Sequence, residues 1–486
     1  MRRDFLQVSG ENFVRNGEKV FLRGFAIGSW MNLEHFMMGM PGTDEMMKEA
    51  FTEVYGAENS RRFFNDLVDA FVTEDDLAYL KSMGLNMVRL PFNYHWFLSD
   101  DAPGVYLENG FARLDRVLGY CRKYDLMAVL DLHSTPGGQN PDWHSDNPTG
   151  QSLFWKYKCF QTQMVDLWRE IARRYAGDPI IAGYDILNEP SFGLTAEQFN
   201  GFYDAVIAAI REVDADHIIF LEGDDFGRKF ELFHKPQDPQ LAYAVHYYPF
   251  VYESGVLDPD MPDEERFRIF DEIFYRQLRA RERFHRPIWC GECGLEHHPD
   301  IELYNRMMAY VLGLCEKNNV SWTLWSYKDA RTMSIVMPKE DSAWMRFTGR
   351  IAARWGHHRE TAQSEETLRH AIDSYFEPIS DEQFYEIEFR MRSIFHRLAV
   401  ETVLKKELRA TPWEEMREMP KDFLFQNCDR YDHIADCIRG FIAAKENEYR
   451  NRTAAKQKSA AVFVLPFGFC CCTMEANTGF GAGEEF

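Results

Sequence analysis

Residues 126–133, LMAVLDLH, and residues 180–188, IIAGYDILN, decide the fold of this chain. Both are short and nearly continuous apolar runs, which is the pattern of strands buried on both faces of a sheet. An amphipathic segment, residues 153–175, lies between them. A buried strand, an amphipathic helix and a second buried strand predict a parallel β–α–β unit.

The same alternation continues on both sides of this unit. Eight apolar runs cover residues 20–27, 86–92, 126–133, 180–188, 217–222, 242–248, 287–292 and 321–326. Amphipathic segments cover residues 74–83, 109–124, 153–175, 195–213, 264–284 and 301–317. The repeats favour an α/β fold of the (β/α)8 TIM-barrel type over a doubly wound open sheet. No GxGxxG follows the first run and no Walker A sequence occurs, so the nucleotide-binding versions of the open sheet lack local support.

Two long segments follow predicted strand ends. Residues 31–72, rich in Met and Phe, come after the first strand, and residues 133–152 form a Gly-, Pro- and Asn-containing stretch after the third. Loops at the C-terminal ends of barrel strands build the active site, so we expect both segments to extend its walls. A long loop after the first strand favours a closed pocket over an open cleft.

The C-terminal third differs from the barrel repeats. Beyond residue 355 the sequence is strongly helical, over residues 364–376, 381–408 and 431–451. We expect one catalytic domain over residues 1–455 that includes a helical C-terminal extension, approximately residues 356–455. Residues 456–486 lack periodicity and are expected to form a poorly ordered tail.

Composition excludes several classes of protein. The 486 residues include 55 Lys and Arg against 77 Asp and Glu, a formal net charge of −22, and 45% are apolar. This balance indicates a folded globular protein and argues against nucleic acid or an anionic membrane as partner. The start of the chain lacks the apolar region of a secretory signal and no run is long enough to span a membrane. We therefore expect a cytoplasmic protein whose cysteines are free thiols.

Polar and aromatic side chains interrupt the predicted strands near their C-terminal ends. They are Arg89, His133, Asn188, Glu189, His246, Tyr248, Glu292 and Trp325. Each alone has an ordinary structural explanation, such as an ion pair, a core histidine or core filling by tryptophan. In a barrel, however, all of them meet at one mouth. Asp131 and Asp185 also lie on predicted strands, but we expect them away from the mouth, in structural roles.

Two carboxylates at this mouth suit the cleavage of a glycosidic bond. One carboxyl, kept protonated, assists the leaving oxygen, and one ionised carboxylate meets the positively charged sugar carbon. Arg89 would keep its carboxylate partner ionised, whereas a carboxyl without a nearby cation would have a raised pKa. Aromatic side chains suit the apolar face of a sugar ring.

The motifs resemble those of glycoside hydrolase family 5, the cellulase-like retaining β-glycosidases. They are LRGFAIGSW, NMVRLPF, VLDLHSTPGGQN, LNEP, HYYPF, GECG and LWSYK, in this order over about residues 20–330. The resemblance implies a barrel fold and double displacement with Glu189 as general acid/base and Glu292 as nucleophile. It implies a carbohydrate substrate, no cofactor and no metal, and the sequence shows no metal-ligand spacing.

The resemblance also implies supporting roles. Asn188 would hold the sugar 2-hydroxyl, and Arg89 and Tyr248 would orient and ionise Glu292. The subsite of the cleaved sugar would be lined by His133 and His246, with His246 near the acid/base. Trp325 would form a stacking platform.

Within the family, the sequence is most similar to the exo-β-glucanase and β-glucosidase branch. It departs from that branch at residues 142–144, DWH, and at Cys293 after the predicted nucleophile. We therefore expect hydrolysis of β-glucosidic bonds in short β-glucans, oligosaccharides or β-glucosides, in an exo manner. Glycolipid (glucosylceramide-type) cleavage, endo-β-glucanase activity and, more distantly, a noncatalytic carbohydrate-binding barrel stay open as alternatives.

Overall fold

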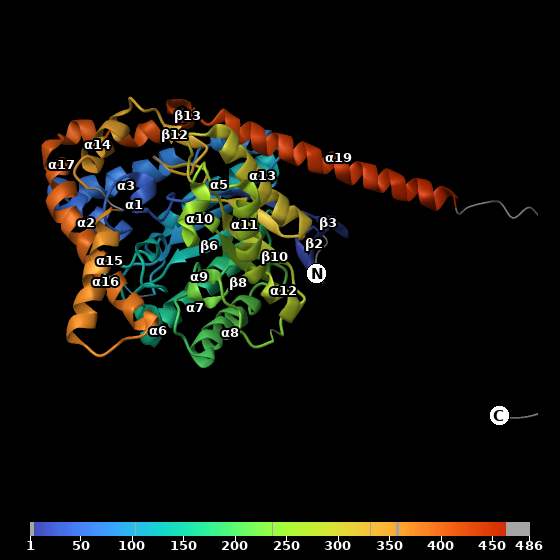
Figure 1. The fold of residues 1–486 in the computed structure, drawn as a ribbon, viewed down its shortest axis with the longest axis horizontal. Coiled ribbons are helices and arrows are strands. Elements are labelled where there is room, and N and C mark those ends of the chain that lie inside the picture. Colours follow the sequence, from blue (N-terminus) through green and yellow to red (C-terminus); the bar gives the residue numbers. More distant parts are fainter. Residues whose placement is uncertain (1–3, 103, 236, 331, 356–358, 463–486) are drawn as a thin grey trace, which may run out of the picture. The chain divides into compact units, whose positions relative to one another are not determined.

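The computed structural model describes residues 4–102, 104–235, 237–330, 332–355 and 359–462. Its centre is a closed barrel of eight parallel strands, each paired with the next along the chain. The strands are β4 (Arg23–Ala26), β5 (Met87–Asn93), β6 (Met127–Ser134), β7 (Ile181–Asp185), β8 (Ile218–Glu222), β9 (Leu241–Tyr247), β10 (Ile288–Cys293) and β11 (Ser321–Leu324). Pairing of β11 with β4 closes the barrel. The predicted TIM barrel is confirmed (Figure 1).

Amphipathic helices surround the strands, as predicted. They are α4 (Glu74–Ser82), α5 (Glu108–Tyr124), α7 (Lys158–Tyr175), α8 (Ala196–Arg211), α11 (Asp263–Gln277), α12 (Arg279–Phe284) and α13 (Ile301–Lys317). Reciprocal capping boxes, Thr73 with Asp76 and Thr195 with Gln198, begin α4 and α8. Between β8 and β9 the described residues contain only the short turn α9 (Asp224–Gly227) instead of a barrel helix.

Shorter elements fill the connections. They are α6 (Leu153–Lys156), α10 (Pro249–Tyr252), α18 (Trp413–Met416) and the 3-10 turns η1 (Tyr94–Trp96), η2 (Trp143–Ser145), η3 (Ser254–Leu257), η5 (Met419–Phe423) and η6 (Phe425–Asn427). A two-stranded antiparallel sheet, β12 (Val336–Pro338) with β13 (Cys428–Arg430), joins the region after the barrel to the C-terminal segment.

A small antiparallel sheet covers the N-terminal end of the barrel. It consists of β1 (Gln7–Ser9), β2 (Asn12–Arg15) and β3 (Glu18–Val20), which the sequence pattern does not predict. Leu6 and Phe13 from this region pack with Met87, Phe220 and Trp289 inside the barrel. The lower half of the barrel is therefore an apolar core, and the polar residues of the strands lie in its upper half.

The segment after β4 is helical rather than a long loop. It contains α1 (His35–Met38), α2 (Asp44–Tyr55) and α3 (Ala57–Phe71). Thr43 caps α2 by accepting from the Met46 N–H, and the side chains of Phe51, Phe63 and Phe64 pack together between α2 and α3. Its Met and Phe residues recur at helical spacing, which explains why the segment folds as a helical pair.

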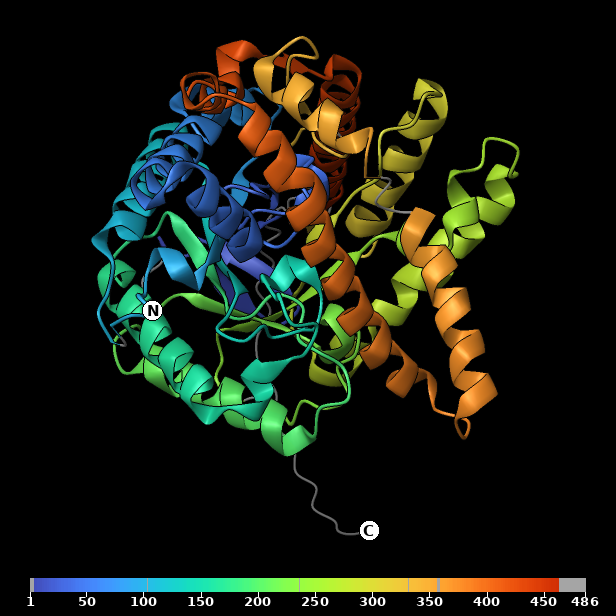
Figure 2. The same cartoon turned by 90° about the vertical axis from the view of Figure 1, so that its left-hand side faces the viewer.

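The C-terminal extension is helical, close to the predicted ranges. Its helices include α15 (Arg359–Tyr375), α16 (Asp381–Ala399), a π-helical turn η4 (Val400–Leu404) and α17 (Lys405–Ala410), and α14 (Ala343–Ala352), which was not predicted, precedes them. Figure 2 shows α16, in orange, running across the face of the barrel where the strand C-termini lie. There Ser393 Oγ donates to the Pro148 carbonyl at 2.5 Å. A Cβ on Gly150, whose φ is +65°, would lie 2.6 Å from the Phe389 carbonyl oxygen, so only glycine permits this close approach.

The chain forms two compact units, Met1–Arg439 and Gly440–Phe486, and the boundary falls within α19 (Asp432–Val462). The predicted domain over 1–455 and tail over 456–486 stay predictions, since residues 463–486 lie outside the described part.

The seven cysteines that the structure describes are free thiols, and Cys159 is the one among them that is exposed. Within the described residues, every helix is too short or too polar to cross a lipid bilayer.

Candidate active site

All eight predicted site residues come together at the C-terminal mouth of the barrel. Strands β5, β6, β9 and β10 carry Arg89, His133, His246 and Glu292. The residues that directly follow β7, β9 and β11 supply Asn188, Glu189, Tyr248 and Trp325. The side chains of Glu189 and Glu292 are only 15% and 7% exposed, so the site is nearly closed to solvent.

Glu292 is held by two donors. Arg89 Nη1 donates to its Oε1, and the Tyr248 hydroxyl donates to its Oε2 at 2.8 Å. Burial and the charge of Glu292 raise the pKa of Tyr248 well above its usual range, so the phenol keeps the proton that it donates. This arrangement holds a carboxylate in one orientation, with its charge balanced by Arg89.

Arg89 is the centre of a buried charge network. Its guanidinium lies 3.1 Å from Asp131, 3.0 Å from Asp185 and 3.3 Å from a third carboxylate, Glu222. It also donates to Asn188 Oδ1 at 2.8 Å. Burial alone would lower the pKa of Arg89, but the surrounding carboxylates raise it well above its usual value. A cation so surrounded stays charged.

This network corrects the expectation for Asp131 and Asp185. The prediction that both lie away from the mouth is wrong, because they lie directly beneath it in contact with Arg89. The reason is the two-residue period of a strand, which points Asp131 to the same side as His133. Glu222 is a site residue that the sequence analysis does not predict. Like Glu292, it is the last residue of its apolar run.

The backbone of Glu189 adopts an unusual conformation. Its φ is +48°, in the left-handed region that residues other than glycine seldom occupy. Two partners hold it there: Glu222 Oε2 accepts from the Glu189 N–H at 2.7 Å, and Asn140 Nδ2 donates to the Glu189 carbonyl at 2.9 Å. Backbone strain of this kind concentrates at functional sites.

Two imidazoles contact the carboxyl group of Glu189. His246 Nδ1 lies 2.6 Å from Oε1, and His144 Nε2 lies 2.9 Å from Oε2. His144 is not among the predicted site residues, although it belongs to the DWH departure in the loop after β6. Each carboxyl oxygen of Glu189 therefore has an imidazole partner.

These contacts change the expected protonation of Glu189. Burial would raise its pKa, but His144 and His246 lower it well below the usual range. Burial alone would lower the pKa of His246, but the charges of Glu222 and Glu292 raise it well above its usual value. We expected the acid to lack a nearby cation and to have a raised pKa, and the two imidazoles contradict this. The lowered pKa of Glu189 and the raised pKa values of His246 and His144 favour a proton on the imidazoles, from which Glu189 can receive it.

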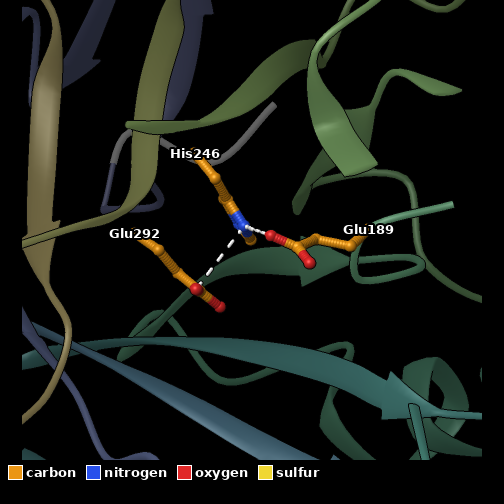
Figure 3. A group of neighbouring side chains, drawn as sticks. All are labelled: Glu189, His246 and Glu292. Carbon is orange, nitrogen blue, oxygen red and sulfur yellow. Dashed lines mark hydrogen bonds and ion pairs between the residues drawn. The ribbon is translucent and has the colours of Figure 1, made fainter. Parts of the chain in front are cut away.

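Figure 3 shows His246 between the two carboxylates, bonded to Glu189 and 3.5 Å from Glu292. One oxygen of each carboxylate and a ring nitrogen of His246 lie within 4.8 Å of one another. Two carboxyl groups this close are typical of retaining glycosidases, in which they stand about 5 Å apart. The 2.6 Å contact between His246 Nδ1 and Glu189 Oε1 is a short hydrogen bond through which the two groups can share a proton.

Trp325 forms one wall of the site and is itself only 4% exposed. Its ring stacks on His133 with centroids 5.4 Å apart and planes 7° apart, and a Cβ on Gly28 would lie 2.7 Å from it. His133 Nδ1 lies 2.8 Å from Asp131 Oδ2, and its Nε2 lies 3.3 Å from Glu34, another carboxylate that the sequence reasoning missed. Burial would lower the pKa of His133, but these two carboxylates raise it to about 10.

Several known proteins are similar to this chain. The family model described as cellulase (glycosyl hydrolase family 5) matches residues 47–331. The chain is 32% identical to a "Beta-xylosidase" of Phanerodontia chrysosporium over 88% of this chain and 96% of the relative. It is 29% identical to "Cellodextrinase A" of Ruminococcus flavefaciens over 48% of this chain and 71% of the relative. Thermotoga maritima Cel5A in complex with mannotriose aligns with a TM-score of 0.47 and 19% identity, over 63% and 90% of the two chains.

Proposed function

The chain belongs to the cellulase family, glycosyl hydrolase family 5, and from this premise we propose that it removes β-linked glucose from short β-glucans, oligosaccharides or β-glucosides. It is a glycoside hydrolase, a retaining glycosidase that acts on β-linked sugars. Beyond this family-level activity, we propose that the sugar is glucose, that cleavage is exo-acting, and that specific residues carry out each step.

The observation that carries the proposal is the difference between the two carboxylates. Glu292 is held by Arg89 and Tyr248, which suits a nucleophile that must stay ionised and face one atom. Glu189 contacts two imidazoles, which suits a group that gives up a proton and takes one back. A noncatalytic sugar-binding barrel has no need for this pair.

The reaction then takes two steps. First, a Glu292 oxygen bonds to the anomeric carbon while the bond to the leaving oxygen breaks and that oxygen takes the proton from Glu189. Second, Glu189 removes a proton from water, the water oxygen bonds to the anomeric carbon and the ester bond to Glu292 breaks. Asn188, fixed by its contact with Arg89, is placed to hold the 2-hydroxyl of the sugar.

Exo action is supported by the enclosure of the mouth. Trp143 from the loop after β6 packs 4.2 Å from His35 and 5.4 Å from Phe36 of α1, ring centroid to ring centroid. These contacts, together with α16 across the strand ends, favour a pocket that takes one chain end over an open cleft. Endo-β-glucanase activity needs such a cleft on both sides of the carboxylates.

A second candidate is the hydrolysis of β-xylosides. The observation that favours it is the β-xylosidase relative, whose alignment covers 88% of this chain. Xylose differs from glucose in lacking the hydroxymethyl group on C5, so the two candidates differ in one small part of the sugar site.

A panel of p-nitrophenyl β-glycosides, β-linked disaccharides, polymeric glucans and glucosylceramide tests the proposal. We expect the highest kcat/KM with β-glucosides or short β-glucans, loss of turnover in Glu292→Ala with an unchanged melting temperature, and a β-anomer as the first product by NMR. Release of internal oligosaccharides from polymeric glucans would reject the exo mode, and near-normal turnover in Glu292→Ala would reject the nucleophile.

A further inference from the structure

A second cavity lies beside the barrel mouth, between the loop after β8 and the helices α10, α11 and α12. It has a volume of about 520 Å³, which is in the range of pockets that bind small molecules. Within the described residues, its lining contains none of the eight predicted site residues. We call this cavity the side pocket, and its lining consists of residues 224–225, residues 228–232, Tyr252, Ile273, residues 276–277 and Arg279.

Two buried side chains of the side pocket carry acceptors without a donor. Asp224 and Gln277 are only 8% and 4% exposed. Asp224 Oδ1 and Gln277 Oε1 each lack a hydrogen-bond partner in the part of the chain that the structure describes. A buried acceptor without a donor costs free energy, so both oxygens favour a ligand that brings donors, such as hydroxyl groups.

The rim of the side pocket carries two arginines without an acidic partner. Arg276 and Arg279 are exposed, and neither forms an ion pair or a hydrogen bond with another described residue. By contrast, Arg228 and Lys229 lie 2.6 Å and 3.1 Å from the carboxylate of Asp225. Guanidinium groups bind carboxylates through paired N–H donors, so the two arginines at the rim favour an anionic ligand.

The acidic side chains of the side pocket leave this cationic rim in place. Asp225 is already paired with two cations. Burial and the charge of Asp225 raise the pKa of Asp224 to about 6, so part of its charge is removed near neutral pH. Glu231 Oε2 accepts from the N–H of Phe230 at 3.0 Å. In a chain with a net charge of −22, a rim with two unpaired guanidinium groups is a local feature and not a result of overall composition.

A sugar acid combines the properties that the side pocket calls for. Its carboxylate suits Arg276 and Arg279 at the rim, and its hydroxyl groups supply donors for Asp224 and Gln277. The apolar face of its ring can pack on Ile273, which also lines the pocket. Because the enzyme acts on sugars, uronic acids are the hydroxylated anions that fit best.

The side pocket adjoins the acid/base side of the catalytic site. The N–H of Asp225 donates to the carbonyl of Ser191, two residues after Glu189, at 3.2 Å. Gln277 Nε2 donates to the carbonyl of His246, the imidazole partner of Glu189, at 2.5 Å. The general acid of a glycosidase protonates the leaving oxygen, so the leaving group lies on this side of the site.

We propose that the side pocket binds a uronic acid unit in the leaving-group part of an oligosaccharide substrate, while glucose occupies the site between Glu292 and Trp325. This inference rests on the proposed function and deepens it, because it names acidic oligosaccharides as a substrate class. The leaving group is still a sugar, as it is in short β-glucans. A free uronic acid acting as an effector would use the same contacts, and the experiment distinguishes the two sources.

Matched oligosaccharides test the inference. Cellobiose and cellotriose are compared with the same compounds in which C6 of the reducing-end sugar is a carboxylate. The members of each pair differ at one carbon, so the ratio of their kcat/KM values reports recognition of the acid. We expect the acid to exceed the neutral compound by about tenfold in at least one pair, as expected from one hydrogen bond to a charged group. About 1 M salt should reduce this ratio, because it screens exposed charges.

Variants connect the ratio to the side pocket. Arg276→Gln and Arg279→Gln should each lower the acid-to-neutral ratio severalfold and leave the kcat/KM of cellobiose unchanged. Arg268→Gln is the matched control, since it removes the same charge from an exposed position of α11 that lies outside the pocket lining. It should leave the ratio unchanged. Melting temperatures verify that the variants fold.

The outcomes separate this inference from the proposed function. A ratio near one in both pairs, or an equal ratio in the rim variants and the control, overturns the inference while cleavage of cellobiose still supports the proposed function. Free glucuronate that changes the cleavage of cellobiose, with a ratio near one, indicates an effector site and overturns the assignment to the leaving group. Failure to cleave any β-glucoside, acidic or neutral, rejects the proposed function and the inference with it.

Discussion

The backbone N–H of Glu189 donates a 2.7 Å hydrogen bond to Glu222 Oε2. One carboxylate thus holds the main chain of another in the left-handed region, with φ at +48°. Glu222 also lies 3.2 Å from His246 Nε2, so the same side chain contacts both the backbone of the proposed acid/base and its imidazole partner. We infer that Glu222 is a positioning residue.

The variant Glu222→Ala should lose about 10- to 100-fold in kcat/KM, since a hydrogen bond to a charged group contributes about 1.5–3 kcal/mol. Glu222→Gln keeps an acceptor for the Glu189 N–H and should recover part of this loss. Both variants should lower the pKa of His246, because Glu222 raises it, and the pH dependence of kcat/KM should shift accordingly. Wild-type kinetics and pH profile in Glu222→Ala would contradict the positioning role.

Glu189→Ala should discriminate between leaving groups. Hydrolysis of methyl β-glucoside needs a proton on the leaving oxygen and should fall by about 10²- to 10⁴-fold. Formation of the glycosyl-enzyme from a dinitrophenyl glucoside, whose leaving group needs no proton, should stay near wild type in a stopped-flow burst. Equal loss on both substrates would reject the acid role of Glu189.

Asp131→Asn should change the protonation of His133. The charge of Asp131 contributes to the raised pKa of His133, about 10, against the opposing effect of burial. Without that charge the pKa falls, so the titration midpoint of His133 should lie clearly below that of the wild type, although Glu34 still raises it. Nitrogen-15 NMR of labelled histidine measures this, with Asp75→Asn on the exposed face of α4 as a matched control. An unchanged titration would show that Asp131 does not set the charge of His133.

Acid should loosen the docking of α16. The Gly42 N–H donates to His396 Nδ1 at 3.2 Å, and burial lowers the pKa of His396 to about 4. An unfolded histidine titrates near 6.5, so the unfolded state binds more protons between pH 6.5 and 4 and stability falls as the pH decreases through that window. The loss should reach about 3 kcal/mol by pH 4.

His396→Gln keeps a neutral acceptor for the Gly42 N–H and removes the titrating group. Its melting temperature and the hydrogen exchange of α16 should therefore depend less on pH between 6.5 and 4 than those of the wild type. Identical pH dependence in the two proteins would assign the acid sensitivity to other residues.

Much of the fold follows from local patterns. Parallel strands that are buried on both faces appear in the sequence as continuous apolar runs. The bounds predicted for all eight strands and for the helices between them therefore lie within a few residues of the observed bounds. The N-terminal sheet β1–β3 could not, because its strands are three or four residues long and mostly half-exposed, with too little alternation to indicate a strand. The helices α2 and α3 were missed because a segment rich in Met and Phe after a barrel strand suggested a loop, although its apolar residues recur at helical spacing.

The site was predicted where a polar residue interrupts an apolar run. That signal finds Arg89 and Glu292, but it cannot find partners that lie on loops distant in sequence. His144 comes from the loop after β6 and Glu34 from the segment before α1, and both meet the site only through the closure of the barrel. For the same reason the two imidazoles beside Glu189, and the lowered pKa that results, could be recognised only in three dimensions.

The position of α16 across the barrel mouth has a consequence for how such enzymes diversify. The groups proposed to make and break bonds all lie on or shortly after barrel strands, whereas α16 is encoded after the last of these strands. An ancestor could exchange or remodel this appendage without disturbing its cleavage chemistry. Selectivity could then drift independently of the catalytic groups, and grafting α15 and α16 between relatives offers a direct route to engineered preferences.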